Sequence, residues 1–206
     1  MFITNTYKVF SVFLNYPCFG LKDQIFISFD LLKKEGFFSD IYLKKIYNFI
    51  CYIKDTDLLF LQEKYILYFD RKKTFSLYLF EHIHGESRER GMAMIDLKNL
   101  YKISNFEIDV SGELPDFIPL FLEYLSVLDS NKSSILLSEI VNIISVIGNR
   151  LRLCDNLYCI VFEFLEYLSS VKPDKTIINK VLFNNENDKL QGFNIDQEWE
   201  EPRVFN

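Results

Sequence analysis

Apolar side chains recur at helical spacing along almost the whole chain, and this pattern limits the fold more than any other feature. Ile46, Phe49, Ile50 and Ile53 stand at i, i+3, i+4 and i+7, so they would share one face of a helix. The sequence shows no clear alternation of apolar and polar residues of the kind that marks a half-buried strand, and no glycine-rich phosphate loop. The pattern predicts an all-α fold.

Turn and capping residues divide this pattern into separate helices. Pro17 ends the first helix, Gly36 suits the C-terminal cap of the second, and Ser39 and Thr56 suit the N-terminal caps of the next two. The expected helices span residues 6–16, 22–35, 39–54, 56–69, 75–83, 88–101, 115–128, 133–153 and 157–170, with a loop at 105–112.

The length and composition predict one helical-bundle domain followed by a tail. The chain has 206 residues, of which 49% are hydrophobic and 25% charged, a balance typical of a folded domain. We expect the domain to cover residues 1–170. Residues 171–206 form the expected polar, acidic tail, since residues 184–206 hold six acidic and two basic side chains, a net charge of −4.

The charge balance and the N-terminus narrow the class of protein. A net charge of −6 argues against nucleic acid as a partner and leaves a basic peptide possible as one. The start of the sequence lacks a signal-peptide pattern, and no uncharged apolar run reaches the roughly 18 residues of a membrane span. We therefore expect a soluble, cytoplasmic protein without direct membrane insertion. The four cysteines, which form no CxxC pair, are expected to be buried reduced thiols rather than two disulfides.

The segment from Glu81 to Gly91 is the most informative one for function. It contains both histidines of the chain, His82 and His84, and a single hydrophobic residue. The flanking pattern places it at a corner between two helices, where charged side chains can point outward together. A solvated corner with local ion pairs, such as Glu86 with Arg90 at i, i+4, is the simplest structural interpretation.

Two catalytic interpretations of this segment are disfavoured. His82 and His84 have a spacing used by zinc sites, but residues at i, i+2 point apart on a helix, and no third histidine or nearby cysteine completes a ligand set. Ser87 lacks the strained turn and oxyanion loop that a serine nucleophile needs. We therefore expect no metal site and no catalytic residues.

The residues from Glu81 to Leu97 closely resemble the characteristic block of the NarJ family of nitrate reductase molybdenum-cofactor assembly chaperones. A second block, Glu113 to Leu125, resembles the same family, and Leu14–Pro17, Tyr65–Asp70 and the ending Trp199–Phe205 give supporting matches. The resemblance spans roughly residues 7–170 and the tail. The first block is long and unusual in composition, which makes it the most specific part of the match.

The resemblance implies a single all-helical domain of the redox-enzyme maturation chaperone group, with no enzymatic activity and no cofactor of its own. The implied partner is the apo catalytic subunit of a respiratory nitrate reductase, held through its N-terminal segment. The implied role is to keep this client competent for molybdenum-cofactor insertion and to delay its docking on the membrane anchor. We expect the chain to be a monomer, with a dimer as the alternative.

A client peptide could lie as a helix in a groove between the helix 115–128 and the helix after Arg88, with acidic side chains meeting basic ones on the peptide. Internal pairing of Asp96 or Glu123 with Arg88 or Arg90, and purely structural roles for the prolines, remain open alternatives. The expected client-binding residues are His82, His84, Glu86, Arg88, Arg90, Asp96, Glu113, Pro115, Asp116, Phe117, Phe121 and Glu123.

Other functions are weighed against this hypothesis. A maturation chaperone for another molybdoenzyme, such as a trimethylamine oxide or dimethyl sulfoxide reductase, is the nearest alternative. A helical enzyme acting on a small molecule or nucleotide is a different class, and titration with guanine nucleotides would reveal it. A structural helical adaptor is the third, and a maturation defect on deletion would exclude it.

Overall fold

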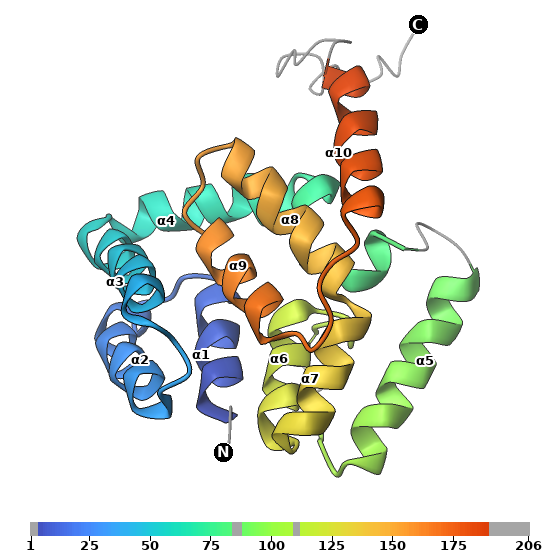
Figure 1. The fold of residues 1–206 in the computed structure, drawn as a ribbon, viewed down its shortest axis with the longest axis horizontal. Coiled ribbons are helices and arrows are strands. Elements are labelled where there is room, and N and C mark those ends of the chain that lie inside the picture. The colour runs from blue at the N-terminus through green and yellow to red at the C-terminus, as the bar shows by residue number, and fades with distance from the viewer. Residues whose placement is uncertain (1–3, 84–87, 109–111, 190–206) are drawn as a thin grey trace, which may run out of the picture. The chain divides into compact units, whose positions relative to one another are not determined.

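The structure, a computed structural model, describes residues 4–83, 88–108 and 112–189. These residues form helices and helical turns without any β-strand, which confirms the all-α prediction (Figure 1). The α-helices are α1 (Thr4–Leu14), α2 (Leu21–Glu35), α3 (Asp40–Asp55), α4 (Leu58–Tyr65), α5 (Arg88–Ile103), α6 (Ile118–Val127), α7 (Ser130–Glu139), α8 (Val141–Leu153), α9 (Cys159–Leu168) and α10 (Lys175–Lys189). A π turn, η1 (Ile66–Asp70), and two 3-10 turns, η2 (Lys73–Phe75) and η3 (Leu79–Glu81), connect α4 to the segment before α5.

The chain divides into two compact units, residues 1–173 and 174–206. The first unit contains α1 to α9. The second contains α10, so part of the segment expected as a polar tail is helical.

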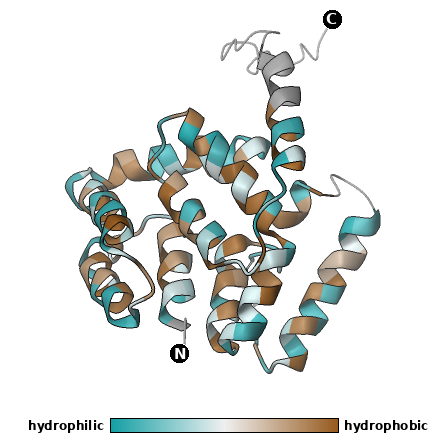
Figure 2. Ribbon diagram, in the orientation of Figure 1, coloured by the Kyte–Doolittle hydropathy of each residue, from teal (hydrophilic) through white to brown (hydrophobic). Residues whose placement is uncertain are grey.

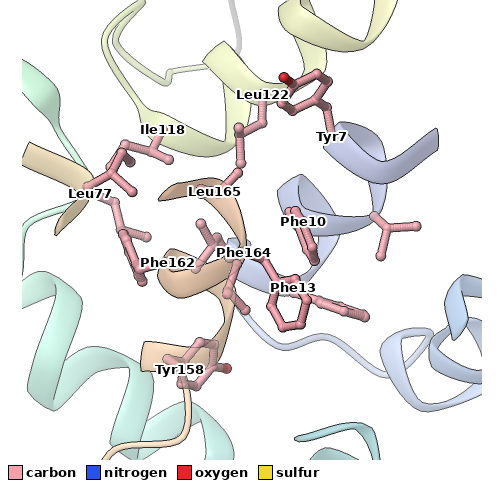
Figure 3. Packing of buried hydrophobic residues seen from close by; sticks show 14 of the residues in the cluster. Tyr7, Phe10, Phe13, Leu77, Ile118, Leu122, Tyr158, Phe162, Phe164 and Leu165 are labelled. Atoms are coloured by element: carbon pink, nitrogen blue, oxygen red, sulfur yellow. The ribbon is translucent and has the colours of Figure 1, made fainter. Parts of the chain in front are cut away.

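Helix α1 lies in the middle of the hydrophobic core of the first unit. It packs against α6, α2 and α9, and Figure 2 shows α6 as largely hydrophobic along its length. Tyr7, Phe10 and Phe13 are buried at helical spacing on α1. The ring of Phe10 lies 5.8 Å from that of Phe164 on α9. Figure 3 shows these α1 side chains pointing toward Leu122 of α6 and the residues of α9.

The start of α1 is capped by a side chain that is distant in sequence. Glu35, the last residue of α2, accepts hydrogen bonds from the backbone N–H groups of Asn5 (2.8 Å) and Thr6 (3.1 Å) and from the Thr6 hydroxyl. A carboxylate at this position satisfies free N–H groups and complements the helix dipole. The cap fixes the end of α2 against α1.

The structure replaces one expected long helix by two. The prediction of a helix over 133–153 is wrong at Ile140, which has a non-helical conformation (φ −107°, ψ 3°) between α7 and α8. The two helices are bent by 67° relative to one another. The bend lets α7 pack against α6 while α8 packs against α9. Apolar spacing continues through such a bend, so the sequence pattern does not reveal it.

Two smaller expectations about helix boundaries are also corrected. The helix expected over 75–83 is instead the turns η2 and η3 joined by extended residues, because this backbone pairs with a distant segment described below. The helix expected to start after Thr56 is capped by Asp57, whose carboxylate accepts from the N–H groups of Leu59 and Phe60. Gly36 does end α2 in the left-handed conformation (φ 69°), as predicted.

The cysteines differ in part from expectation. All four are free thiols, but Cys18 and Cys154 are exposed and Cys51 and Cys159 are half-buried, so the prediction that they are buried is wrong. In the segments that the structure describes, no single helix is both long and apolar enough to cross a membrane. Helices α7 and α8 meet that criterion only as a pair, across their bend.

Candidate functional site

Two segments far apart in sequence meet at an isolated antiparallel bridge between Tyr78 and Phe117. The backbone of residues 77–79 pairs with that of residues 116–118 through two hydrogen bonds of 2.8 and 3.0 Å. The rings of Tyr78 and Phe117 lie 5.3 Å apart. This junction fixes the chain before the charged Glu81 segment against the start of α6, and so brings the two blocks of the sequence together.

Asp116 strengthens the junction from inside. Its side chain is fully buried, and its Oδ2 accepts a hydrogen bond from the N–H of Phe80 over 3.0 Å. Burial raises the pKa of this carboxyl, while the hydrogen bond from Phe80 and the charge of Arg90 oppose the rise. Its Oδ1 is buried without a hydrogen-bond partner. In this structure Asp116 therefore holds the turn η3 in place rather than forming part of the surface.

Helix α5 joins the rest of the unit mainly through its C-terminal half. Tyr101 is fully buried, and its hydroxyl donates to the carbonyl of Pro115 over 2.8 Å. The ring of Tyr101 lies 4.6 Å from that of Tyr124 on α6. Toward its N-terminus, α5 leaves Met92 and Ile95 about 60% exposed, at 61% and 59%. Helix α5 thus carries a largely exposed face, in keeping with its place at the edge of the unit in Figure 1.

Among the described residues, the charged segment contributes the pair of Arg90 with Glu81 and a half-buried imidazole to the same region. Arg90 lies 3.6 Å from Glu81. His82 donates from Nε2 to the carbonyl of Ser76 over 2.9 Å. Burial lowers the pKa of His82, and the nearby charge of Arg150 lowers it further, against the opposing effects of the Ser76 hydrogen bond and of Glu81. His82 therefore remains neutral around pH 7 and stabilises the connecting segment.

Those expected client-binding residues that the structure describes fall into three groups by exposure. Arg88, Asp96 and Glu113 are exposed, while His82, Arg90 and Glu123 are half-buried. His84 and Glu86 lie outside the described residues. The third group is buried and consists of Pro115, Asp116, Phe117 and Phe121. Much of α6 is buried, with α1 and α7 packed against it. A groove between this helix and α5 stays a prediction.

A pocket of about 230 Å³ opens beside the junction. Its walls come from four segments, namely the end of α1, the α4–η1 turn, the bridge residues and the stretch before α6. The lining residues are Asn15, Tyr16, Tyr65, Phe69, Asp70, Leu77, Tyr78, Glu113 and Phe117. The segments that gave supporting matches to the family, Leu14–Pro17 and Tyr65–Asp70, thus meet the start of the second block here.

Two carboxylates give this pocket its electrostatic character. Glu113 accepts a hydrogen bond from the hydroxyl of Tyr78 over 2.7 Å. Partial burial raises the pKa of Asp70, and the nearby charge of Glu113 raises it further. Burial and the bond to Glu113 likewise raise the pKa of Tyr78. The pocket therefore presents negative charge and aromatic surface together.

Sequence reasoning included Glu113 and Phe117 among the site residues but missed the others in this pocket. Asp70, Tyr16 and Tyr65 lie in segments that resembled the family, yet each segment is short and says nothing by itself about a pocket. Only the folding of α1 against the α4–η1 turn places them together, through the bond from the Tyr65 hydroxyl to the carbonyl of Leu14 (2.9 Å) and the contact of Tyr16 with Tyr65 (5.4 Å).

The described part of the chain contains no group of three or more His, Cys, Asp or Glu side chains arranged to hold a metal ion. A second pocket, of about 520 Å³, lies at the C-terminal end of α5 and includes Tyr101, Lys98 and Lys102 among its lining residues. Both pockets are lined by aromatic and charged side chains.

These helices form the same fold as one solved structure. A crystal structure of a candidate redox enzyme maturation protein from Archaeoglobus fulgidus superposes with a TM-score of 0.58 at 20% sequence identity. The superposition covers 80% of this chain and 92% of the other.

Sequence comparison gives the family. The nitrate reductase delta subunit family model matches residues 42–162, and the chain belongs to that family. The chain is 37% identical over 144 residues to proteins of Escherichia coli K12 and E. coli O157:H7 that are each named nitrate reductase molybdenum cofactor assembly chaperone NarJ. These matches cover 69% of this chain and 60% of each relative, so the chain spans less than two thirds of their length.

Proposed function

We propose that this chain is an assembly chaperone for a respiratory nitrate reductase. It binds the apo catalytic subunit through that subunit's N-terminal segment, and it keeps the client competent for molybdenum-cofactor insertion and for later docking on its membrane anchor. The observation that carries the proposal is family membership, together with the identity to relatives whose names state cofactor assembly.

The surface around the junction supports peptide binding. Four apolar side chains that belong to the two sequence blocks are exposed, namely Ile83 (54%), Met92 (61%), Ile95 (59%) and Leu114 (42%). Exposed apolar side chains on a surface that also carries charges are typical of sites that receive an amphipathic helix. Arg88, Asp96 and Glu113 supply such charges, so they are the proposed contacts for orientation and register.

A chaperone must release its client, which sets the expected strength of binding. Micromolar affinity, about −8 kcal/mol, allows capture and release, whereas much tighter binding would block later assembly. The apolar contacts supply most of this free energy, and isolated exposed ion pairs, such as those that Arg88 or Asp96 could form, contribute little to it.

Co-purification tests the proposal. The tagged chain would be expressed in a host without its own nitrate reductase chaperone, together with the catalytic subunit either complete or lacking its N-terminal segment. We expect the complete subunit to be retained and the shortened one to be lost, with nitrate reductase activity appearing only when the chaperone is present. Equal retention of both forms would contradict binding through the N-terminal segment, and activity without the chaperone would contradict the assembly role.

Two substitutions test the charged segment directly. Arg88→Ala and Arg90→Ala are expected to weaken client binding, Arg90→Ala also because it removes the pair with Glu81. If each variant leaves both client binding and enzyme maturation unchanged, these arginines take no part in recognition. A peptide from a trimethylamine oxide reductase, added in parallel, measures the specificity for the nitrate reductase client.

A further inference from the structure

The pocket beside the Tyr78–Phe117 bridge has an apolar floor and an acidic rim. Tyr65, Phe69 and Leu77 are at most 5% exposed and form its floor. Asp70 and Glu113 are exposed and belong to its rim. This arrangement suits a ligand with an apolar stem and a cationic head group, because the stem can contact the floor while the charge stays near water and the carboxylates.

The size of the pocket selects the class of ligand. Its volume of about 230 Å³ lies below the roughly 300–1,000 Å³ typical of pockets for cofactors and drug-sized molecules. A dinucleotide cofactor is therefore too large. A single long side chain from another polypeptide is of the appropriate size.

The charges around the pocket indicate that the ligand carries a positive charge. None of the residues that line it is a lysine, arginine or histidine. Among the described residues, neither Asp70 nor Glu113 forms a salt bridge. The two carboxylates also lie close enough for the charge of Glu113 to raise the pKa of Asp70. A cation placed between them would relieve this repulsion.

We propose that this pocket receives one arginine side chain of the client's N-terminal segment, with the guanidinium at Asp70 and Glu113. This inference rests on the proposed function and adds a specific subsite to it. Arginine fits better than lysine because its planar fork can bond to two carboxylates at once. It also stacks on aromatic faces, and Tyr16, which is 46% exposed, offers such a face at the pocket.

A client-independent experiment tests the pocket itself. N-acetylarginine amide and its uncharged analogue N-acetylcitrulline amide would be titrated into the labelled full chain while backbone amide shifts are recorded by NMR. We expect saturable shifts at Asn15, Tyr16 and Tyr78 with the arginine compound at millimolar concentration, and much weaker ones with the citrulline compound. Equal shifts with both, or none at these residues, would overturn the inference even if the chain binds its client.

A double-mutant cycle then tests the subsite with a client peptide. Each arginine of a synthetic peptide covering the client's N-terminal segment is replaced in turn by citrulline, and affinities are measured for the wild-type chain and for Asp70→Asn/Glu113→Gln. One citrulline replacement should weaken binding to the wild type by at least about tenfold, as expected for charge-assisted hydrogen bonds. That replacement should have almost no further effect in the double variant.

A control variant must separate the loss of these two carboxylates from the change in net charge. Asp30→Asn/Glu139→Gln removes two exposed carboxylates that do not line the pocket, on α2 and α7. It changes the net charge by the same amount, and it should retain the full citrulline effect. If the wild type binds the peptide but no citrulline effect depends on Asp70 and Glu113, the subsite is refuted while the proposed function stands. If the wild type shows the arginine shifts but binds no client peptide, the proposed binding of the client's N-terminal segment is wrong. The preference of the pocket for a cation would still stand.

Discussion

The N–H of Phe80 donates to Oδ2 of Asp116 over 3.0 Å, and this single bond joins positions 36 residues apart. Together with the backbone pairing of residues 77–79 and 116–118, it holds both sequence blocks in one region of the molecule. Asp116 therefore helps to position the two blocks from inside, because its side chain is fully buried. The predictions below test this junction, the attachment of α5 and the packing that supports them.

Asp116→Ala should destabilise the fold by about 1–3 kcal/mol, because it removes the carboxylate that accepts from the partly buried N–H of Phe80. Asp116→Asn should cost less, since the amide oxygen can accept the same bond and no charge is buried. Urea unfolding of the three proteins at pH 7 measures both differences. An alanine variant as stable as the wild type would show that the bond contributes nothing to the junction.

Tyr101→Phe should loosen α5. The buried hydroxyl of Tyr101 satisfies the carbonyl of Pro115, and its loss should cost about 1–3 kcal/mol. Amide hydrogen exchange in the C-terminal half of α5 should become faster. Tyr124→Phe is the matched control, because among the described residues its hydroxyl bonds to Ser104 alone, which is half-buried and can turn to water. A larger effect for Tyr124→Phe than for Tyr101→Phe would contradict the prediction that the Tyr101 hydroxyl attaches α5.

His82 should make folding stability depend on mildly acidic pH. Its folded pKa is lowered, mainly by burial, so below about pH 6.5 the unfolded chain binds a proton that the folded chain does not. Stability should therefore decrease as pH falls from that value toward the lowered folded pKa, by up to about 1.4 kcal/mol per pH unit. His82→Gln keeps an N–H donor for Ser76 and should remove this part of the slope. Identical slopes in wild type and variant, measured by urea unfolding between pH 7 and 5, would refute the assignment.

Gly148→Ala should destabilise the contact between α8 and α9. A Cβ at this position would lie 2.8 Å from Cβ of Phe162, so the helices must separate, at a cost of about 1–3 kcal/mol. Thermal unfolding measures the loss. Gly91→Ala on α5 is the control, because nothing lies within 4 Å of the added Cβ. It should raise stability by up to about 1 kcal/mol through helix propensity. Similar effects at the two positions would contradict close packing at Gly148.

The boundaries of the helices show how far local reasoning extends. Apolar spacing and the cap at Gly36 correctly predicted α2, since both signals depend on neighbouring residues. The helix expected over 75–83 was wrong because its backbone groups bond to residues 116–118 instead of to one another. Propensity cannot anticipate such pairing, as it contains no information about distant partners.

The candidate site likewise has a part that the sequence predicted and a part that depended on packing. The two blocks were identified from residue identity, but Pro115, Phe117 and Phe121 proved to be buried while Asp70 and Tyr65 line the pocket. Whether a side chain near α6 reaches solvent depends on what covers it. Here α1 covers much of α6, a contact between helices that are more than a hundred residues apart in the chain.

The sequence by itself determined the all-α fold, the family and the segment that carries charge, because helical spacing and a long specific block are local properties. Only the tertiary structure decided that Glu35 caps α1, that buried Asp116 accepts a hydrogen bond from Phe80, and that Asp70 and Glu113 share a pocket. Each of these depends on burial and on hydrogen bonds between distant segments, which arise when the chain packs and the desolvated polar groups must find partners.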